Sequence, residues 1–478
     1  MAGNKKPRQR NRKTASGKPK TSGHATLKTT TATQKPAANT GMVWPQIYTM
    51  QNAIPLSMQF SFEVSERWPH DRLLENQMRQ ITALVRHAAT TVPYYRHKLA
   101  NHALPSISPM TMDHFRTLPL LSRTDIQSAG KTLFSEAVPA GHGAAFEIRS
   151  SGSTGRPVRV LGTGLTGMYV RALSMRGHLW HQRDLSAKSV DIRTALATPG
   201  TSRKYRWSSV PDAGESVRLD ISLPVSVLLD QLIREDPVYM QTHPYTLKGL
   251  IKNSVERGIR PQSLREVRTF GEALEPDIRE AAREHWGVAV VNNYSAMEVG
   301  TIAHQCPESE NLHVQSESVL LEVLNDDGTP CLPGEVGRVV LTALHNFATP
   351  LIRYDIGDYA EAGEACACGR GLPVLKRILG RQRNFVLLPT GEKRFPEAWS
   401  KLTDIAPDIR QFQLTQKSIE KIEVKLVVSA PLTNSTELQI TQYLIEKFGH
   451  PFDYQYVYVD DIARGANGKF EEFKSELL

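Results

Sequence analysis

Four separated stretches of the 478-residue chain contain residue types that suit phosphate, metal or ribose chemistry. The first is SSGSTG, residues 150–155. Its glycines allow backbone N–H groups to turn toward an anion, and its hydroxyl side chains add further hydrogen-bond donors. The spacing is not that of a Walker loop. Because a hairpin turn has a similar composition, this stretch alone leaves open both a phosphate loop and a simple turn.

Two further stretches contain carboxylates, one after an expected strand and one in an expected turn. Glu298 lies in NNYSAMEVG, directly after the apolar run VAVV. A carboxylate at this position can hold a magnesium ion at the lip of an α/β sheet, or it can lie in an exposed loop. Asp355 and Asp358 lie beside Arg353 in PLIRYDIGDYAE. Such a turn can offer a carboxylate to ribose hydroxyls, or it can be a solvated turn with an ion pair.

The fourth stretch is ARGANGKFEEF, in which Lys469 follows a glycine close to the C-terminus. A lysine on a mobile loop can neutralise phosphate as a point charge. A single lysine near a chain end usually has no such role. Each of the four stretches is therefore a modest indication when it is considered alone.

The elements that must position these residues alternate between strands and helices. A helix with apolar residues at helical spacing begins near residue 70, and Pro93 ends it. Short strands are expected on both sides of residues 150–155. Later helices and strands alternate in a pattern that favours a three-layer α/β body with a partly parallel sheet. The expected segments are helices over 225–236 and 246–258, a strand over 287–295, a β-rich part over 316–344, and an α+β unit over the last hundred residues, with a boundary near residue 380.

The composition is that of an ordinary globular enzyme, with 40% hydrophobic and 22% charged residues. No apolar run approaches the ~20 residues of a membrane span. The net charge of +9 lies in residues 1–40, which contain ten Lys or Arg and no acidic residue. This tail is predicted to be disordered, with loose affinity for polyanions. A specific nucleic-acid or membrane tether is the alternative, while a secretory signal is excluded because an apolar core segment is missing. The four cysteines do not form a disulfide scaffold, so a reducing cytoplasm is expected.

The order of these stretches resembles the adenylate-forming superfamily. Within it, the chain resembles the phenylacetate-CoA ligase family, close to the branch labelled capsular polysaccharide biosynthesis proteins. The resemblance covers roughly residues 70–478. Ser150 to Pro157 resemble the family's ATP loop, and Gly271, Glu272 and Ala273 resemble its adenine-flanking G-E segment. Tyr294 to Glu298 resemble its Y-G-x-[ST]-E segment, and Arg353 to Asp358 resemble its R-Y-x-x-G-D segment. Gly380 and Arg381 resemble its hinge G-R, and Gly468 and Lys469 resemble its terminal G-K.

The resemblance implies an α/β fold with a large, multi-subdomain N-terminal domain and a small mobile α+β C-terminal domain. The expected parts are a basic tail (1–40), an adenylation domain (41–380) and a small domain with the catalytic lysine (381–478). The family joins a carboxylic acid to ATP, releases pyrophosphate, and transfers the acyl group to a second nucleophile, usually coenzyme A. Expected partners are therefore a small carboxylic acid, ATP and coenzyme A or another acceptor. No specific nucleic-acid partner is expected, and a homodimer is left open.

The resemblance also assigns roles residue by residue. Lys469 would bridge the carboxylate and the α-phosphate, Glu298 would ligate Mg²⁺, and Arg381 would grip the nucleotide. Tyr294 would stack on adenine and Asp358 would bind the ribose. The remaining expected nucleotide contacts are Ser150, Ser151, Gly152, Ser153, Thr154, Gly155, Gly271, Glu272, Ala273 and Asn293.

Three positions depart from the family pattern. Met297 stands where a hydroxyl residue usually precedes the glutamate, and Met cannot donate a hydrogen bond to phosphate. Gln382 and Arg383 replace the acidic residue that commonly follows the hinge G-R. These changes are compatible with adenylation but bear on the transfer step. The alternatives are transfer to an amine or a carrier protein, and, in a different class, a non-catalytic nucleotide-binding relative.

The cysteines and one histidine suggest a structural zinc site. Three thiolates and an imidazole would close a tetrahedral shell, and the family's CxCGR element is present as CACGR. The spacings are not those of standard zinc fingers, and reduced buried cysteines need no metal, so both interpretations stay open. His304 is a substitute ligand, and Cys331 is left over. The candidate ligands are Cys306, His313, Cys366 and Cys368.

Overall fold

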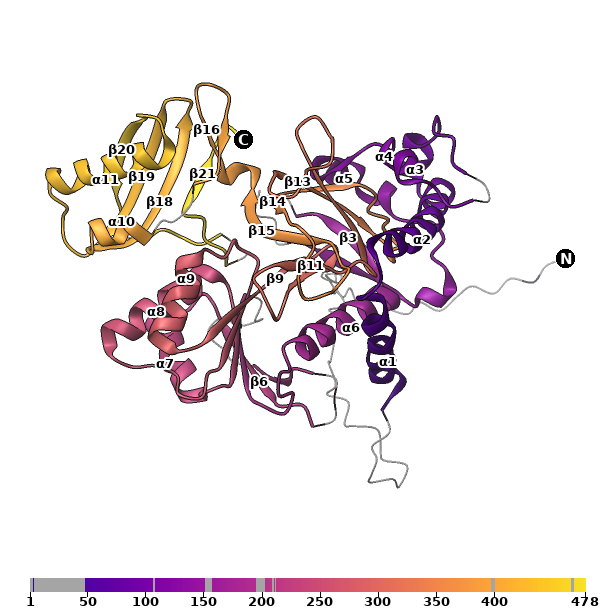
Figure 1. The fold of residues 1–478 in the computed structure, drawn as a ribbon, viewed down its shortest axis with the longest axis horizontal. Helices are drawn as coiled ribbons and strands as arrows, with labels where there is room; N and C mark the ends of the chain where they lie inside the picture. Colours follow the sequence, from indigo (N-terminus) through magenta and orange to yellow (C-terminus); the bar gives the residue numbers. More distant parts are fainter. Residues whose placement is uncertain are drawn as a thin grey trace. The chain divides into compact units, whose positions relative to one another are not determined.

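A computed structural model describes residues 3, 48–105, 108–150, 157–194, 203–208, 210, 212–396, 400–465 and 468–478. Apart from residue 3, the basic tail lies outside the described residues. So do Ser151, Gly152, Ser153, Thr154 and Gly155 of the expected ATP loop. The chain divides into two compact units, Met1–Ile47 and Tyr48–Leu478. All elements below belong to the second unit, and their order confirms the α/β fold class (Figure 1).

The helices and strands alternate along most of this unit. The α-helices are α1 (Met50–Ser65), α2 (His70–Thr91), α3 (Pro93–Lys98), α4 (Met112–Arg116), α5 (Arg123–Ala129), α6 (Gly164–Trp180), α7 (Val225–Glu235), α8 (Pro244–Arg257), α9 (Pro276–Ala281), α10 (Ser400–Ile405) and α11 (Asn434–Phe448). Short 3-10 turns are η1 (Gly130–Leu133), η2 (Ala140–His142) and η4 (Gln382–Asn384), and η3 (Ala282–Trp286) is a π-helical turn.

The strands are β1 (Leu121–Ser122), β2 (Ala145–Arg149), β3 (Arg159–Thr163), β4 (Ser189–Arg193), β5 (Arg203–Arg206), β6 (Glu215–Asp220), β7 (Tyr239–Thr242), β8 (Glu266–Phe270), β9 (Ala289–Ala296), β10 (Gly300–Gln305), β11 (Leu312–Val314), β12 (Val319–Leu324), β13 (Val336–Ala343), β14 (Tyr354–Ala362), β15 (Val374–Arg381), β16 (Val386–Leu387), β17 (Lys393–Arg394), β18 (Ile409–Ser418), β19 (Lys421–Val428), β20 (Asp453–Tyr458) and β21 (Phe473–Ser475).

A 13-stranded sheet organises the larger part of the unit, in the order β12-β13-β14-β15-β11-β10-β9-β8-β7-β4-β6-β5, with β1 paired to β14. Strands β6, β4, β7, β8 and β9 are parallel neighbours, and the pairings from β9 to β12 are antiparallel. Helices α7, α8 and α9 pack against the parallel section (Figure 1). Their buried apolar residues form one core with alternate residues of the strands. The expected partly parallel sheet is confirmed.

The antiparallel section has its own core, to which α2 contributes one face. Leu73, Met78, Ile81, Leu84 and Val85 are buried at helical spacing, as the sequence predicts. Helix α2 ends at Thr91, and the proline two residues later starts α3. Proline is tolerated there because the first turn of a helix needs no N–H donor. Strands β2 and β3 pair antiparallel on either side of residues 150–157, so the expected strand pair is also confirmed.

The C-terminal part has a separate four-stranded sheet, in the order β20-β19-β18-β21. Helices α10 and α11 cover it, and its apolar core runs from Val386 to Phe473. This core begins shortly after β15 ends at Arg381. The domain boundary near residue 380 stays a prediction.

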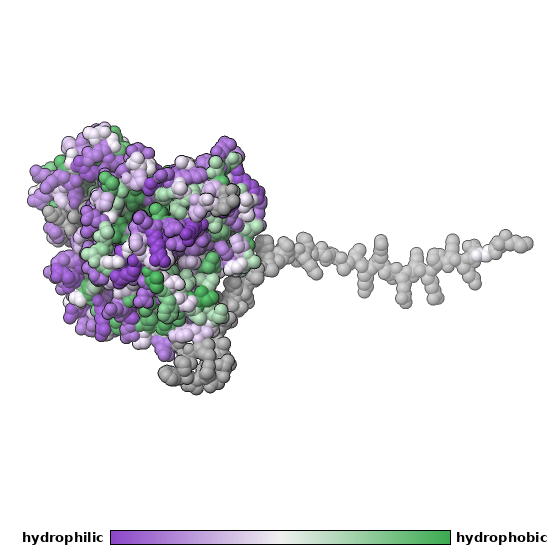
Figure 2. Space-filling view, turned by 45° about the vertical axis from the view of Figure 1, so that its right-hand side comes forward, coloured by the Kyte–Doolittle hydropathy of each residue, from purple (hydrophilic) through white to green (hydrophobic). Residues whose placement is uncertain are grey.

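Hydrophilic and hydrophobic side chains are interspersed on the face drawn in Figure 2. Among the described residues, no helix combines the length and the apolar character needed to cross a bilayer.

Candidate active site

The carboxylate of Asp358 receives side chains from two other strands. Asp358 on β14 lies opposite Arg381 on β15 in the register of the sheet, and the Arg381 Nε atom lies 3.4 Å from Asp358 Oδ1. The hydroxyl of Tyr294 on β9 donates to Asp358 Oδ2 at 2.8 Å. Burial, and next the Asp358 carboxylate, raise the pKa of Tyr294 well above its ordinary value. Tyr294 is therefore a neutral hydrogen-bond donor, and three predicted site residues are brought together.

Glu298 and the base of the expected ATP loop are connected through an arginine. Glu298 is buried in the turn after β9, and Tyr354 donates to its Oε1 atom at 3.0 Å. Arg123 Nη1 lies 3.9 Å from the same oxygen, and Arg123 Nη2 donates to Ser150 Oγ at 3.2 Å. Ser150 Oγ also accepts from the backbone N–H of Val158 at 2.8 Å. A positive charge therefore lies between the carboxylate and the loop at which phosphates are expected to bind.

The position of Tyr354 depends on an unusual backbone conformation in the preceding residue. Arg353 has φ +47°, in the left-handed region that non-glycine residues seldom adopt. Its Nη1 atom donates to the carbonyls of Arg116 and Leu118, and its Nε atom forms an ion pair with the buried Glu322 at 3.2 Å. These contacts offset the strain and direct the next side chain toward Glu298.

Lys469 lies at the tip of a tight C-terminal turn. The backbone N–H of Gly465 donates to the carbonyl of Lys469 at 2.9 Å, and Gly468 has φ +76°. A Cβ atom on Gly271 would lie 3.2 Å from Lys469 Cε and 3.0 Å from the His243 ring. The glycine at the end of β8 thus leaves room for the lysine stem. Burial and Arg381 lower the pKa of Lys469, while Asp358 and Glu272 oppose the shift.

The three residues after Lys469 are each anchored by a side-chain contact. Phe470 stacks on Tyr245, with ring centroids 4.0 Å apart and an interplanar angle of 18°. Glu471 forms an ion pair with Arg383 at 2.7 Å. The next residue, Glu472, forms an ion pair with Lys248 of α8 at 2.8 Å. Because the anchors follow Lys469 directly, they fix where the base of its side chain lies.

Glu272 supplies a further anchor. Its Oε1 atom accepts from the backbone N–H of Phe470, and its Oε2 atom accepts from that of Tyr245, both at 3.0 Å. Burial raises the pKa of Glu272 to about 7, although these hydrogen bonds oppose the shift. Glu272 therefore holds the turn that carries Lys469. The same segment, Gly271 to Ala273, is the one for which an adenine-flanking role is expected.

Asn293 is joined to a buried histidine. The Asn293 side-chain amide lies 2.9 Å from His304 Nδ1, and His304 Nε2 donates to the carbonyl of Leu173 at 2.8 Å. Both ring nitrogens of His304 are therefore engaged. His304 as a substitute zinc ligand was a wrong expectation, because its ring is turned toward α6 and β9.

We expect the fold to lose stability in mild acid because three buried or partly buried histidines are held neutral. Burial lowers the pKa of His243 to about 4, of His304 to about 3 and of His345 to about 4. An unfolded histidine titrates near 6.5, so the unfolded chain binds more protons below that pH. The free energy of unfolding should fall by up to about 1.4 kcal/mol per pH unit for each histidine between about pH 6 and pH 4.

Urea unfolding at a series of pH values tests this expectation. His345 Nε2 donates to the carbonyl of Glu317, and its ring stacks on Tyr169. His345→Gln should flatten the pH dependence, whereas the same change at the exposed His285 should leave it unaltered. An unchanged slope in His345→Gln would contradict the assignment.

Comparisons with known proteins find relatives of this chain in sequence and in fold. The model of the CapK C-terminal domain family matches residues 397–476. A phenylacetate-coenzyme A ligase of Thermus thermophilus is 27% identical over 385 residues, covering 77% of this chain and 84% of that ligase. A phenylacetate-coenzyme A ligase of Pseudomonas putida is 24% identical over 342 residues, which cover 68% of this chain and 74% of that ligase. The chain also shares its fold with 2-hydroxyisobutyryl-CoA ligase, whose crystal structure shows the postadenylation state in complex with R3-HIB-AMP. The TM-score is 0.68 and the sequence identity is 16%. The match covers 86% of this chain and 91% of the ligase chain.

These matches support the phenylacetate-CoA ligase family of adenylate-forming enzymes as the family of this chain. The match of its C-terminal part supports the CapK-like branch. Both findings agree with the resemblance that the motifs indicated.

The cysteine and histidine cluster of this chain forms a compact set of donor atoms. The four atoms of Cys306, His313, Cys366 and Cys368 lie within 4.8 Å of one another. Cys306 Sγ and Cys366 Sγ are 3.8 Å apart, and Cys368 Sγ is 3.3 Å from His313 Nε2. A tetrahedral zinc ion with Zn–S bonds of about 2.3 Å separates its sulfur ligands by about 3.8 Å. The spacing and the donor chemistry both fit zinc.

The surroundings of the cluster also suit a metal. His313 Nδ1 points at the carbonyl of Leu372 at 3.5 Å, as the second nitrogen of a metal-ligating histidine commonly does. Burial opposes ionisation of Cys366, but hydrogen bonds from the Cys368 backbone and from Ser309 and Asn311 outweigh it. The pKa of the Cys366 thiol is consequently lowered to about 7. Cys331 is not part of the cluster.

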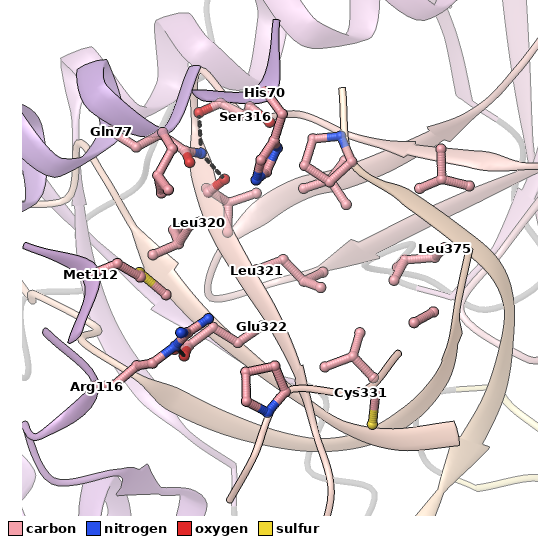
Figure 3. Close-up of a pocket in the computed structure, with 18 residues that line it drawn as sticks. His70, Gln77, Met112, Arg116, Ser316, Leu320, Leu321, Glu322, Cys331 and Leu375 are labelled. Carbon is pink, nitrogen blue, oxygen red and sulfur yellow. Dashed lines mark hydrogen bonds and ion pairs between the residues drawn. The ribbon is translucent and has the colours of Figure 1, made fainter. Parts of the chain in front are cut away.

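A cavity of about 200 Å³ lies away from these groups, between α2, α4 and the β12 region (Figure 3). On one wall, Gln77 donates to the backbone carbonyls of Ser316 and Val319. On another, Arg116 faces Glu322 at 3.7 Å. None of the predicted nucleotide or zinc residues lines this cavity. Its Glu322 is the partner of Arg353, so this region supports the strand that carries Tyr354.

Several residues of the site could not be selected from the sequence. Arg123 precedes Ser150 by 27 positions, and it reaches Glu298 only because β1 pairs with β14. Tyr245 and Lys248 lie on α8, and in the sequence nothing distinguishes them from other residues of a helix. The one available signal was the acidic pair in GKFEEF, whose two carboxylates need cationic partners once they are partly buried.

Proposed function

We propose that this AMP-forming ligase converts a carboxylic acid and ATP into an acyl-adenylate and pyrophosphate, and then transfers the acyl group to coenzyme A. The observation that carries the proposal is the convergence of Lys469, Asp358 and Arg381. The Arg381 Nε atom lies against the Asp358 carboxylate, and both groups affect the pKa of Lys469. Three residues that are far apart in the sequence thus bring two cationic side chains and one carboxylate close together.

Adenylation requires two anions to approach each other. In the proposed reaction the substrate carboxylate attacks the α-phosphate and pyrophosphate leaves. Lys469 would lie between the carboxylate and the α-phosphate, where its ammonium group stabilises the charge that develops in the transition state. The anchors at Phe470, Glu471 and Glu472 would keep the lysine in place before the substrates arrive, so less order must be gained at the moment of reaction.

The nucleotide would lie across the strand ends that carry Tyr294, Asp358 and Arg381. Asp358 would accept hydrogen bonds from the ribose hydroxyls, and Tyr294 would pack against adenine. Ser150 and the loop that follows it would receive the terminal phosphates, with Arg123 as a nearby cation. Asn293, through His304, would keep the adjoining part of β9 in place.

Glu298 fits the expected magnesium ion. Its Oε1 atom already accepts from Tyr354, and its Oε2 atom makes no hydrogen bond with any residue that the structure describes. Carboxylate oxygens are the ligands that magnesium prefers. When bound, the ion would supply positive charge to the phosphates as pyrophosphate leaves.

Coenzyme A is proposed as the acceptor because relatives named as CoA ligases cover most of the chain. The 2-hydroxyisobutyryl-CoA ligase shows the same fold in a postadenylation state. In this chain the ion pair between Arg383 and Glu471 joins the segment after Arg381 to the lysine turn. We expect this pair to move together with the C-terminal part when that part rotates for the transfer step. The ion pair between Glu472 and Lys248 of α8 would open instead. The compartment proposed for the reaction is the cytoplasm.

A two-stage assay tests the function. The first stage measures ATP–pyrophosphate exchange over a panel of aryl, acyl and amino acids, and at least one acid should support exchange well above background. The second stage supplies the active acid with coenzyme A, an amine or a carrier protein. A thioester with coenzyme A supports the proposal. CoA-independent product formation would replace coenzyme A with another acceptor, and background exchange throughout would favour a non-catalytic nucleotide-binding relative.

A further inference from the structure

The parallel section of the large sheet has one apolar face and one polar face. On the apolar face, alternate residues of β4, β6, β7 and β8 pack against α7, α8 and α9. The intervening residues lie on the other face, because successive side chains of a strand point to opposite sides. At the middle of the four strands these residues are Arg218, Asp191, Gln241 and Arg268. Parallel strands are usually apolar on both faces, so the polar face requires an explanation.

These four residues form one row across the sheet. Asp191 of β4 lies opposite Arg218 of β6 on one side and opposite Gln241 of β7 on the other. Gln241 in turn lies opposite Arg268 of β8. Because neighbouring strands are about 4.8 Å apart, Gln241 and Arg268 are direct neighbours at one end of the row.

The carboxylate of Asp191 is fully engaged within the protein. Its Oδ1 atom accepts from Arg193 Nε at 2.6 Å, and its Oδ2 atom lies 3.1 Å from Arg218 Nη2. The hydroxyl of Tyr205 donates to the same Oδ2 atom at 2.9 Å. Asp191 therefore balances two arginines at its own end of the row and forms no ion pair with Arg268.

The other end of the row lacks a counter-charge. Within the part of the chain that the structure describes, the Arg268 and Gln241 side chains make no hydrogen bond or ion pair, and the solvent-shielded Arg268 Nε atom has no acceptor. Glu266, two residues earlier on β8, is paired with Arg183 at 2.7 Å. Burial lowers the pKa of Arg268 only to about 10, so the guanidinium is charged at neutral pH. A largely buried cation of this kind favours the binding of an anion.

The row lies close to the strand end at which Lys469 is held. Arg268 precedes Gly271 by three residues, about 10 Å of extended chain, and Gly271 leaves room for the Lys469 stem. At the level between them, the Arg193 guanidinium lies 4.9 Å from the centre of the Phe270 ring. The Arg193 side chain is 33% exposed, so solvent reaches this face. A small molecule can therefore extend from Lys469 to Arg268.

We propose that the acid activated by this enzyme is a dicarboxylic acid, whose second carboxylate binds to Arg268 and Gln241. The inference rests on the proposed function, because that function assigns the reacting carboxylate to Lys469. A guanidinium and an amide can donate to both oxygens of a carboxylate, and the two carboxylates would be up to about 10 Å apart. A phosphate fits less well, since its two negative charges would meet one unpaired cation. Packing of Arg268 over Trp207, whose ring centre is 5.9 Å away, leaves the Gln241 amide unexplained.

ATP–pyrophosphate exchange with matched acids tests the proposal. Glutarate, adipate and 4-carboxyphenylacetate are each compared with the acid in which a methyl group replaces the second carboxylate. At least one dicarboxylate should exceed its methyl counterpart by about 10- to 100-fold in kcat/KM, the usual effect of a charge-assisted hydrogen bond. Arg268→Gln should remove this preference, mainly by raising KM for the dicarboxylate. Exchange with the methyl acid should stay within about twofold of the parent.

Two further variants complete the design. Gln241→Glu places a carboxylate beside Arg268 at nearly constant volume, so it should remove the preference even if Arg268→Gln does not fold. Arg265→Gln is the matched control, because Arg265 is an exposed arginine directly before β8, and it should keep the parent preference. Thermal unfolding of each variant reports whether it is folded.

The outcomes separate this inference from the function on which it rests. A dicarboxylate preference that is lost in Gln241→Glu and in folded Arg268→Gln, but kept in Arg265→Gln, supports the inference. Exchange with the methyl acids alone, or a preference that survives these changes, overturns it while the proposed function stands, and Arg268 is then a packing residue. Background exchange with every acid of a broad panel contradicts the proposed function and overturns the inference with it.

Discussion

Lys469→Ala should suppress ATP–pyrophosphate exchange by about 10² to 10³-fold while leaving ATP binding largely intact. The size of the effect follows from removing a preorganised cation from the point at which charge develops, where a single donor typically contributes a few kcal/mol. ATP binding should survive because the ribose and phosphate contacts proposed for Asp358, Tyr294 and the loop after Ser150 do not involve the lysine. Exchange kinetics give the first quantity, and calorimetric titration with ATP gives the second.

Two further variants isolate the role of the lysine charge. Lys474→Ala on β21 is a matched control, because it removes a partly buried lysine from the same C-terminal segment without touching the turn. Its exchange rate should stay within about twofold of the parent enzyme. Lys469→Arg keeps the charge but changes its reach, and it should recover only part of the activity. Parent-like exchange in Lys469→Ala would remove Lys469 from the proposed mechanism.

The elements of the fold were predictable because their signals are local. The helix over α2 follows from apolar residues three and four positions apart, and the proline that begins α3 fixes where that helix ends. The strands β12 and β13 follow from two apolar runs separated by turn residues. In each case the pattern and the structure depend on the same few neighbouring residues.

The connections within the site were not predictable, because they depend on sheet register and on long-range packing. Arg353 illustrates this point. The sequence places it in a turn near Asp358, but its φ of +47° and its pairing with Glu322 depend on a strand residue 31 positions earlier. Glu272 is a second example, since its carboxylate holds the backbone of Phe470 from almost two hundred positions away. Such contacts leave no periodic pattern in the sequence.

The cysteine cluster falls between these two cases. The C-x-C spacing of Cys366 and Cys368 is a local signal. Cys306 and His313 come close to them only because β10, β11 and β15 pair antiparallel. The sequence could propose the four ligands without showing that they meet. Their donor atoms lie within 4.8 Å of one another, which is the observation on which a structural zinc site now rests.

We expect protein purified without added metal to contain about one zinc ion per chain, because four protein donors close the coordination shell. Removing the metal, or one ligand through Cys366→Ser, should lower the free energy of unfolding by more than about 4 kcal/mol, as is typical when a structural metal is lost. The cluster joins the loop after β10 to the segment before β15, so its loss releases two connections of the large sheet. Elemental analysis and chemical unfolding measure the two effects.

Cys331→Ser is the matched control for this prediction, because Cys331 is a partly buried free thiol that lies outside the cluster. It should retain the zinc ion and unfold like the parent chain. Chelation should then destabilise the parent and Cys331→Ser equally, and should leave Cys366→Ser nearly unchanged, since that variant has already lost its metal. If metal-free protein and the Cys366→Ser variant unfold like the parent, the four side chains are a packed set of reduced thiols and an imidazole, and no zinc is needed to hold these strands together.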